Sequence, residues 1–161
     1  LGGISTFIVG GVTGVFLAAV PYDLVMQDTY YVVGHFHLIL VGFIVFALFA
    51  ALYYYFPLIT GREYGRRLAR VHFWLTFVGV WFAFGPMLLL GIEGLPRRMA
   101  GYPARFELLQ WVSSAGMALL GLGGIVLAFN VVQSLRNGDD AGDDPWDLAA
   151  DGMLTAEWER E

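Results

Sequence analysis

Two histidines stand two residues apart in the stretch DTYYVVGHFHLIL, residues 28–40. They are His35 and His37, and no Asp, Glu, Lys or Arg occurs between Thr29 and Gly61. An ionisable side chain at membrane depth is costly, so it usually marks a functional position. Residues two apart on an α-helix point about 200° apart, so the two imidazoles face nearly opposite sides. They cannot share one metal ion, but each could serve a different partner.

Neutral imidazole is a good axial ligand of haem iron. Two flat cofactors, one on either side of the helix, would explain the spacing of His35 and His37. The competing interpretation is that one or both histidines hydrogen-bond to neighbouring helices. The third histidine, His72, lies at the other end of a later apolar segment. We interpret it as a packing or interfacial residue.

A pair of arginines, Arg97 and Arg98, occurs in the polar stretch 93–107. If the helix with the histidines enters the membrane near Asp28, His35 lies about 10 Å deep at 1.5 Å per residue. The predicted topology places the 93–107 loop on that same side. The forked donors of arginine match carboxylates such as the propionates of a haem. The alternative is that both arginines only solvate the end of a helix.

The elements that must position these residues are membrane helices. The chain has 161 residues, of which 58% are hydrophobic, and a mean hydropathy of +0.65. Four stretches lack charged side chains, and each is long enough to supply the ~20 residues of a spanning helix. We therefore predict an all-α membrane protein with four transmembrane helices near residues 1–20, 30–56, 70–92 and 107–135. The residues between them, 21–28, 57–70 and 93–107, are predicted loops.

The arginines predict the orientation. The second loop carries four arginines against Glu63, a net charge of +3, which places it on the cytoplasmic side. Both termini then lie inside, and the first and third loops lie outside. Residues 137–161 hold nine acidic residues and one arginine, so we predict an acidic, disordered cytoplasmic tail there.

Other classes of site are absent from the sequence. There is no cysteine, which excludes disulfides, Cys-ligated zinc and thiol catalysis. The glycine clusters GGVTG (10–14) and GLGG (121–124) follow no predicted strand, so we interpret them as contacts between helices rather than phosphate loops. No patch of basic and aromatic residues suits nucleic acid.

Taken together, DTYYVVGHFH (28–37) and LPRR (95–98) resemble the haem–copper oxidases. The likeness is to the C-terminal part of their catalytic subunit I. It extends over residues 1–136 and includes GGVTG, FPLITG (56–61), RVHF (70–73) and YP (102–103). The resemblance implies the last four of twelve helices in that subunit, in a multi-pass protein of the cell membrane, with a prokaryotic plasma membrane as the expected location.

The resemblance also implies roles for individual residues. His35 would be the axial ligand of the high-spin haem, where oxygen is reduced opposite copper, and His37 an axial ligand of the low-spin haem. Phe36 would lie between the two haems. Arg97 and Arg98 would bind propionates. Asp23 and Tyr30 would lie in the polar region above those propionates.

One position departs from the family. Many members have histidine immediately before the Asp of DTYY, and that pair helps to bind a non-redox magnesium or manganese ion. Here the pair is Gln27-Asp28. A Gln carbonyl can ligate magnesium, which prefers oxygen, and Asp28 could equally be a helix N-cap.

The resemblance implies an oxidoreductase that pumps protons, of which this chain would be a fragment without activity of its own. The copper ligands would lie in earlier helices. The expected partners are the remainder of subunit I, subunit II and the other oxidase subunits, oxygen, the lipid bilayer, and cytochrome c or quinol as electron donor. Nitric oxide reductases are relatives, but the DTYYVV and LPRR context is more similar to an oxidase. The alternative is a non-catalytic transporter or structural subunit with an intramembrane histidine pair.

Overall fold

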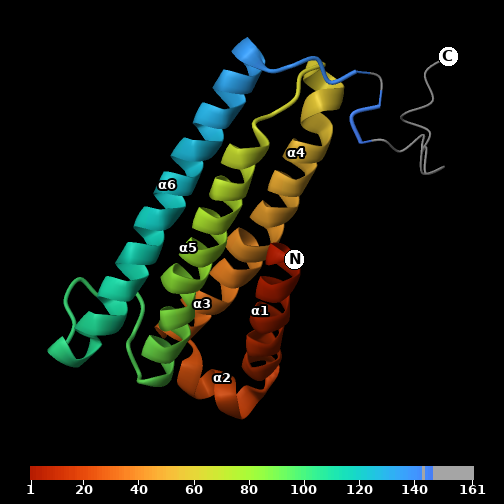
Figure 1. The fold of residues 1–161 in the computed structure, drawn as a ribbon. Helices are drawn as coiled ribbons and strands as arrows, with labels where there is room; N and C mark the ends of the chain where they lie inside the picture. The colour runs from red at the N-terminus through yellow and green to blue at the C-terminus, as the bar shows by residue number, and fades with distance from the viewer. Residues whose placement is uncertain (143, 147–161) are drawn as a thin grey trace.

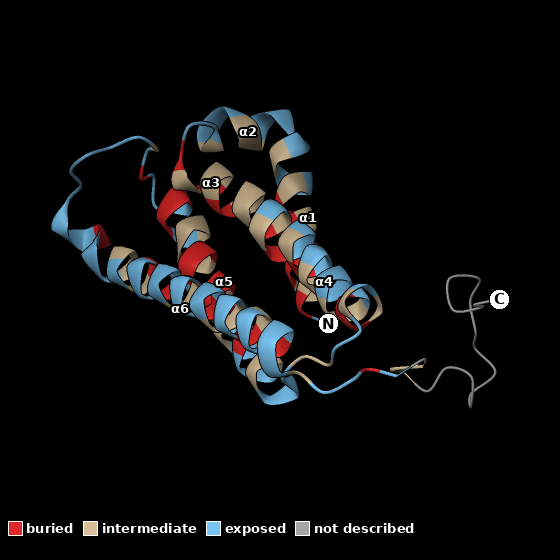
Figure 2. Ribbon diagram, turned by 90° about the horizontal axis from the view of Figure 1, so that it is seen from above, coloured by how far each residue is buried: buried red, intermediate tan, exposed pale blue. Residues whose placement is uncertain are grey.

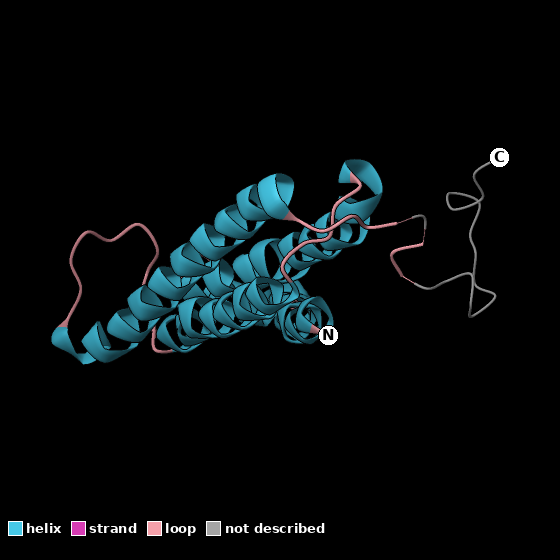
Figure 3. Ribbon diagram, turned by 45° about the horizontal axis from the view of Figure 1, so that its top comes forward, coloured by secondary structure: helices cyan, strands magenta, loops and turns pink. Residues whose placement is uncertain are grey.

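The computed structural model describes residues 1–142 and 144–146. Over these residues the chain is helical, without strands, and the helices lie roughly side by side (Figures 1 and 3). In chain order they are α1 (Gly2–Ala18), α2 (Val20–Met26), α3 (Tyr30–His37), the π-helical turn η1 (Leu38–Ile44), α4 (Val45–Thr60), α5 (Arg66–Ile92), the 3₁₀ turn η2 (Ala104–Phe106) and α6 (Glu107–Asn137). This confirms the all-α prediction.

Three helices are long and apolar enough to cross a membrane among the described residues: Tyr30–Thr60, Arg66–Ile92 and Ala104–Asn137. The bent pair α1 and α2 makes a fourth if it counts as one span. The predicted count of four spans is therefore consistent with the structure. Two predicted boundaries were wrong, because the second helix continues to Thr60 and the third begins at Arg66.

The first predicted loop is largely a helix. Residues Val20–Met26 form α2, which meets α1 at a bend of 102° and crosses the end of the bundle (Figure 1). The bend occurs at Ala19, whose backbone is extended, and Pro21 follows in the first turn of α2. Proline cannot continue the previous helix, but it fits the start of a new one, where its missing N–H is not needed. Sequence reasoning treated Pro21 as a loop residue and so missed the new helix.

The packing depends on close approach between helices. A Cβ added to Gly116 of α6 would lie 2.2 Å from the backbone nitrogen of Ala83 in α5, so these two helices touch backbone to backbone. The core combines residues of α5 with residues of the continuous helix Tyr30–Thr60, which is made of α3, η1 and α4. These core residues are Leu38, Phe46, Val80, Ala83 and Phe84. Much of the remaining apolar surface is exposed, most visibly along α6 (Figure 2). Exposed apolar faces of this kind suit contact with lipid or with further membrane helices.

The residues after α6 turn back onto the bundle. The N–H of Glu63 donates to Asp139 O at 2.8 Å, and the N–H of Ala141 donates to Gly61 O at 3.0 Å. Trp146 stacks on Tyr54, with ring centroids 5.9 Å apart and planes inclined by 3°. The expected disordered tail began at 137, but its first part contacts the loop between α4 and α5. Residues 147–161, on which most of that prediction falls, lie outside the described residues.

Candidate functional site: two histidines on opposite sides of one helix

The helix that carries the histidines begins at Thr29. The Thr29 hydroxyl accepts a hydrogen bond from the Tyr31 N–H at 3.2 Å, so Thr29 is the N-cap of α3 and the interpretation of Asp28 as N-cap was wrong. Gly91 allows the start of α3 to lie against α5, because a Cβ there would be 2.0 Å from the Tyr31 nitrogen. After His37 the helix widens into the π-helical turn η1. Such turns occur often at functional sites.

His35 points toward α1. Its Nδ1 lies 2.8 Å from Gly10 O and 3.1 Å from the Thr13 hydroxyl, and that hydroxyl itself donates to Gly10 O at 2.7 Å. A carbonyl oxygen can only accept, so this network assigns the proton to Nδ1. Nε2 then carries a free lone pair, and it has no hydrogen-bond partner among the described residues. Gly14 leaves the space beside the ring, since a Cβ there would lie 2.7 Å from His35 Cε1.

His37 points toward α5. Its Nδ1 lies 2.8 Å from Val33 O, one turn earlier in the same helix, which again assigns the proton to Nδ1. The ring stacks on Phe84 of α5, with centroids 4.6 Å apart and planes inclined by 18°. Phe36 also contacts the His37 ring, with centroids 4.3 Å apart and planes inclined by 31°. The prediction that the two histidines face different sides of the helix is therefore confirmed, since one contacts α1 and the other α5.

The LPRR segment is tied to the start of the histidine helix. The N–H of Tyr30 donates to Leu95 O at 3.0 Å, and the N–H of Arg97 donates to Asp28 O at 2.8 Å. Leu95 is buried, so it fixes the segment to the bundle. The prediction that this loop lies at the same end of the molecule as Asp28 is confirmed.

Arg97 and Arg98 differ in their surroundings. The Arg97 guanidinium is ion-paired with the Asp28 carboxylate, to which both Nε and Nη2 donate. Arg98 is exposed and has no ion pair among the residues that the structure describes. Both Asp28 and Arg98 have positive φ angles, of 62° and 68°. Such a conformation is uncommon for residues other than glycine.

Asp23 and Tyr30 lie at the same end of the bundle. Asp23 is half-buried on α2. Tyr30 is half-buried too, and it packs on the apolar cluster of Leu90, Leu95 and Phe106. Tyr30 therefore has a packing role that the sequence did not reveal.

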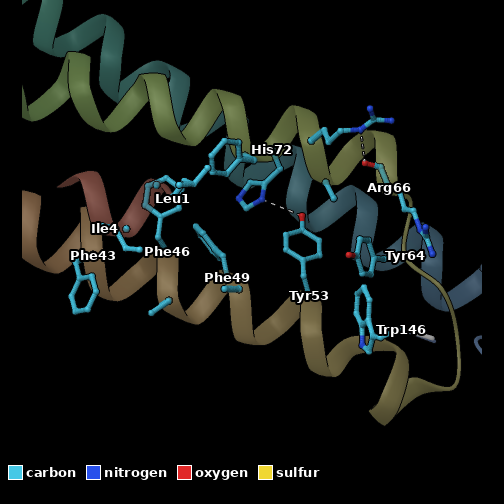
Figure 4. Close-up of a pocket in the computed structure, with 17 residues that line it drawn as sticks. Leu1, Ile4, Phe43, Phe46, Phe49, Tyr53, Tyr64, Arg66, His72 and Trp146 are labelled. Atoms are coloured by element: carbon cyan, nitrogen blue, oxygen red, sulfur yellow. Dashed lines mark hydrogen bonds between the residues drawn. The ribbon is translucent and has the colours of Figure 1, made fainter. Parts of the chain in front are cut away.

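His72 lies near the opposite end, in a separate environment (Figure 4). It is 2% exposed, its Nδ1 lies 3.1 Å from the Tyr53 hydroxyl, and its Nε2 is buried without a hydrogen-bond partner within the described residues. It borders a cavity of about 710 Å³, whose lining combines aromatic side chains with small and aliphatic residues. Tyr64, in the α4–α5 loop, closes one end of this cavity, and burial raises the pKa of its phenol, partly opposed by Arg66. The structure does not bring His72 together with His35 or His37.

Sequence reasoning missed the residues that support His35. Gly10, Thr13 and Gly14 all belong to GGVTG, which was interpreted only as a helix-packing cluster. The available signal was a threonine between glycines on a membrane helix, because a hydroxyl there needs a hydrogen-bond partner.

Comparisons with known proteins agree with this arrangement. A model of the family "Cytochrome C and Quinol oxidase polypeptide I" matches residues 1–119. The chain belongs to this family. It is 48% identical over 159 residues to cytochrome c oxidase polypeptide 1 of Halobacterium salinarum, covering 98% of this chain and 27% of that protein. It is 44% identical over 158 residues to cytochrome c oxidase subunit 1 of a Synechocystis species, covering 98% of this chain and 28% of that protein.

The fold agrees as well. A solved structure of a haem–copper terminal oxidase dimer superimposes with a TM-score of 0.74 at 24% identity, covering 83% of this chain and 25% of that one. The present chain thus spans about a quarter of the length of the curated relatives it matches. Family membership makes the chain part of a multi-pass membrane protein, and it argues against the alternative of an unrelated transporter. The family implies haem and copper as cofactors.

Proposed function

We propose that the chain is the C-terminal part of the catalytic subunit of a terminal respiratory oxidase. The complete enzyme would reduce oxygen to water with electrons from cytochrome c or quinol and couple this to proton translocation. This segment would supply haem ligands and propionate-binding arginines. The remainder of subunit I, which would carry the copper ligands, subunit II and the other subunits would complete the site.

One observation carries the proposal. Both imidazoles have Nδ1 held by a backbone carbonyl, His35 by Gly10 and His37 by Val33, so both present an unprotonated Nε2. Iron-ligating histidines need this arrangement, because the hydrogen bond at the second nitrogen fixes the tautomer and the ring orientation. We assign His35 to the high-spin haem and His37 to the low-spin haem. Bound there, haem iron would supply the one-electron and oxygen chemistry that amino-acid side chains lack.

The surrounding residues would hold these ligands and set their basicity. The Gly10 carbonyl and the Thr13 hydroxyl both accept from His35 Nδ1–H, which increases electron density on Nε2. The stack on Phe84 fixes the plane of the His37 ring. Phe36, between the two histidines in sequence and in contact with His37, would lie between the two cofactors.

The propionate roles divide between the two arginines. Arg98 has no ion pair among the described residues, so its fork is available to a carboxylate. Arg97, held by its ion pair with Asp28, would add positive charge near the propionates. Asp23 and Tyr30, at the same end of the bundle, would border the polar region above them.

Magnesium does not fit these residues well. The Asp28 carboxylate already accepts both Nε and Nη2 of Arg97, and Gln27 replaces the usual histidine. No group of three or more potential metal-binding His, Cys, Asp or Glu side chains occurs among residues 1–142 and 144–146.

Substitution of the histidines in the full-length oxidase tests the proposal. In the purified protein, His37→Ala should remove the low-spin haem spectrum, and His35→Ala should remove the high-spin spectrum and oxygen consumption, because each loses an iron ligand. His72→Gln is the matched control and should keep both spectra. Normal haem spectra and turnover in both alanine variants would contradict the assignment, and loss of haem in the control would show that any buried histidine has the same effect.

A further inference from the structure

A shallow groove runs along the outer side of α5 and α6. It has a volume of about 400 Å³. Its lining residues are Arg70, Val71, Trp74, Leu75, Val78 and Leu119. Arg70, at one end, is the only charged residue among them. The groove therefore has one cationic end and an otherwise apolar length.

The apolar length follows from helical spacing. Val71, Trp74, Leu75 and Val78 recur at intervals of three, one and three residues, which places them on one stripe of α5. Leu119 contributes from α6. Trp74 is 59% exposed and Val71 48% exposed. Apolar side chains left open on a helix long enough to span the membrane suit hydrocarbon.

Arg70 has no counter-charge in the described part of the chain. The two ion pairs found there are Arg66–Glu63 and Arg97–Asp28. The hydrogen bond that Arg70 makes is from Nε to Arg66 O at 3.4 Å. Arg70 also lines the cavity shown in Figure 4, so its side chain borders both that cavity and the groove.

The position of the charge is unusual for a helix. α5 begins with Arg66, Arg67 and Arg70 near its N-terminus, and its first turn contains no acidic residue. A helix N-terminus carries a partial positive charge, so cations there are unfavourable unless an anion lies nearby. Asp139 and Asp140 return to this end of the molecule, but their backbone contacts are with Glu63 and Arg62 in the α4–α5 loop. Arg70 has no ion pair among the described residues, so its guanidinium is open to an external anionic group.

We propose that this groove binds an anionic phospholipid of the leaflet that faces the α4–α5 loop. The phosphate would accept from the Arg70 guanidinium, and one acyl chain would lie along Val71, Trp74 and Val78 against Leu119. The aliphatic stem of Arg70 covers apolar surface while its head reaches the interface. The order of groups along the groove, cation first and hydrocarbon after, is the order of groups in such a lipid.

The dimensions favour a lipid over another helix. From Arg70 to Val78 the groove is eight residues long, about 12 Å at 1.5 Å per residue. A helix of a further subunit would contact α5 over much of the ~30 Å hydrocarbon thickness. The charge of Arg70 also favours a lipid, because a spanning helix that occupied this groove would need a carboxylate at the level of Arg70.

Native mass spectrometry of the full-length oxidase tests the proposal. The protein is delipidated and titrated with phosphatidylglycerol or with phosphatidylcholine of identical acyl chains. We expect preferential retention of phosphatidylglycerol, and we expect Arg70→Gln to reduce that preference about fivefold, the effect of one basic residue at an anionic surface. Arg67→Gln is the matched control: Arg67 is exposed like Arg70 but does not line the groove, so without a direct contact to the lipid its substitution should leave the preference within about twofold of the original.

A second variant separates the groove from general charge. Val78→Trp fills the apolar part and should lower the number of tightly bound lipids without changing any charge. Equal retention of both lipids, equal effects of Arg70→Gln and Arg67→Gln, or an unchanged lipid count in Val78→Trp would each overturn the proposal. So would a photoreactive residue at Val78 that cross-links to another subunit instead of to lipid.

Discussion

Substitution of Gly14 tests how the protein holds His35. A Cβ at Gly14 would lie 2.7 Å from His35 Cε1 and 3.4 Å from Nε2. Ordinary van der Waals contact begins near 3.4 Å, so Gly14→Ala must displace the ring by about 0.7 Å, the difference between 3.4 and 2.7. The other possible response is for α1 to move away, which would open the contact of Gly10 with Ile39 at the same crossing.

A displacement of this size matters because ligand geometry tolerates only ~0.5 Å. Misplacement of a reacting group by about 1 Å can cost 10²-fold in rate. For Gly14→Ala in the full-length oxidase we therefore expect a loss of oxygen turnover of roughly 10- to 100-fold. The iron–histidine stretching band of the high-spin haem should shift in resonance Raman spectra. The low-spin spectrum, which depends on His37, should be unchanged.

Gly11→Ala is the matched control. It lies on the same helix and gains the same helix propensity, but a Cβ there meets nothing within 4 Å. It should keep both spectra and full turnover. If Gly14→Ala shows the same turnover and the same stretching band as Gly11→Ala, the contact between Gly14 and the His35 ring does not position an iron ligand, and the reasoning fails.

Three further predictions concern other parts of the molecule. Asp28→Asn should raise the midpoint potential of the haem whose propionates lie nearest, and Arg97→Met should lower it, because a nearby positive charge favours the electron-rich state. For a charge about 10 Å away, each shift should be roughly several tens of millivolts. A redox titration that shows no shift in either variant would mean that the Arg97–Asp28 pair has only a structural role. Gly116→Ala should destabilise the α5–α6 pair by about 1–3 kcal/mol, seen as a lower thermal midpoint by circular dichroism, whereas Gly121→Ala, with nothing within 4 Å, should not. Trp146→Ala should speed proteolysis after α6, because it removes the stack on Tyr54 of α4. An unchanged cleavage rate would show that the hydrogen bonds of the preceding residues are enough to hold this segment in place.

The sequence by itself determined the presence and type of the main elements. Charge-free runs of about 20 residues or more can exist in a membrane protein only as helices, since a backbone in lipid must satisfy its own hydrogen bonds. The spacing of His35 and His37 likewise fixed their opposite directions, because helical geometry is set by the backbone. The motifs around them, DTYYVVGHFH and LPRR, predicted the family to which the chain belongs.

Other features were decided only by the tertiary structure. The acceptor of the His35 proton lies 25 residues away on α1, and the carboxylate paired with Arg97 lies 69 residues away. No periodicity within one helix reports such contacts, because they depend on where two helices cross. The same holds for the turn of the chain at Ala19, the π-helical turn after His37 and the return of residues 138–142 to the α4–α5 loop.

The glycines show why this division arises. Gly11 and Gly14 are three residues apart in one apolar helix, and the sequence alone gives them the same meaning. Among the described residues, a Cβ at Gly11 would meet nothing within 4 Å, whereas Gly14 faces the His35 ring. A residue without a side chain carries no chemical sign of its neighbour. Its role is set by the distance of closest approach between helices, and that distance exists only once the helices have packed.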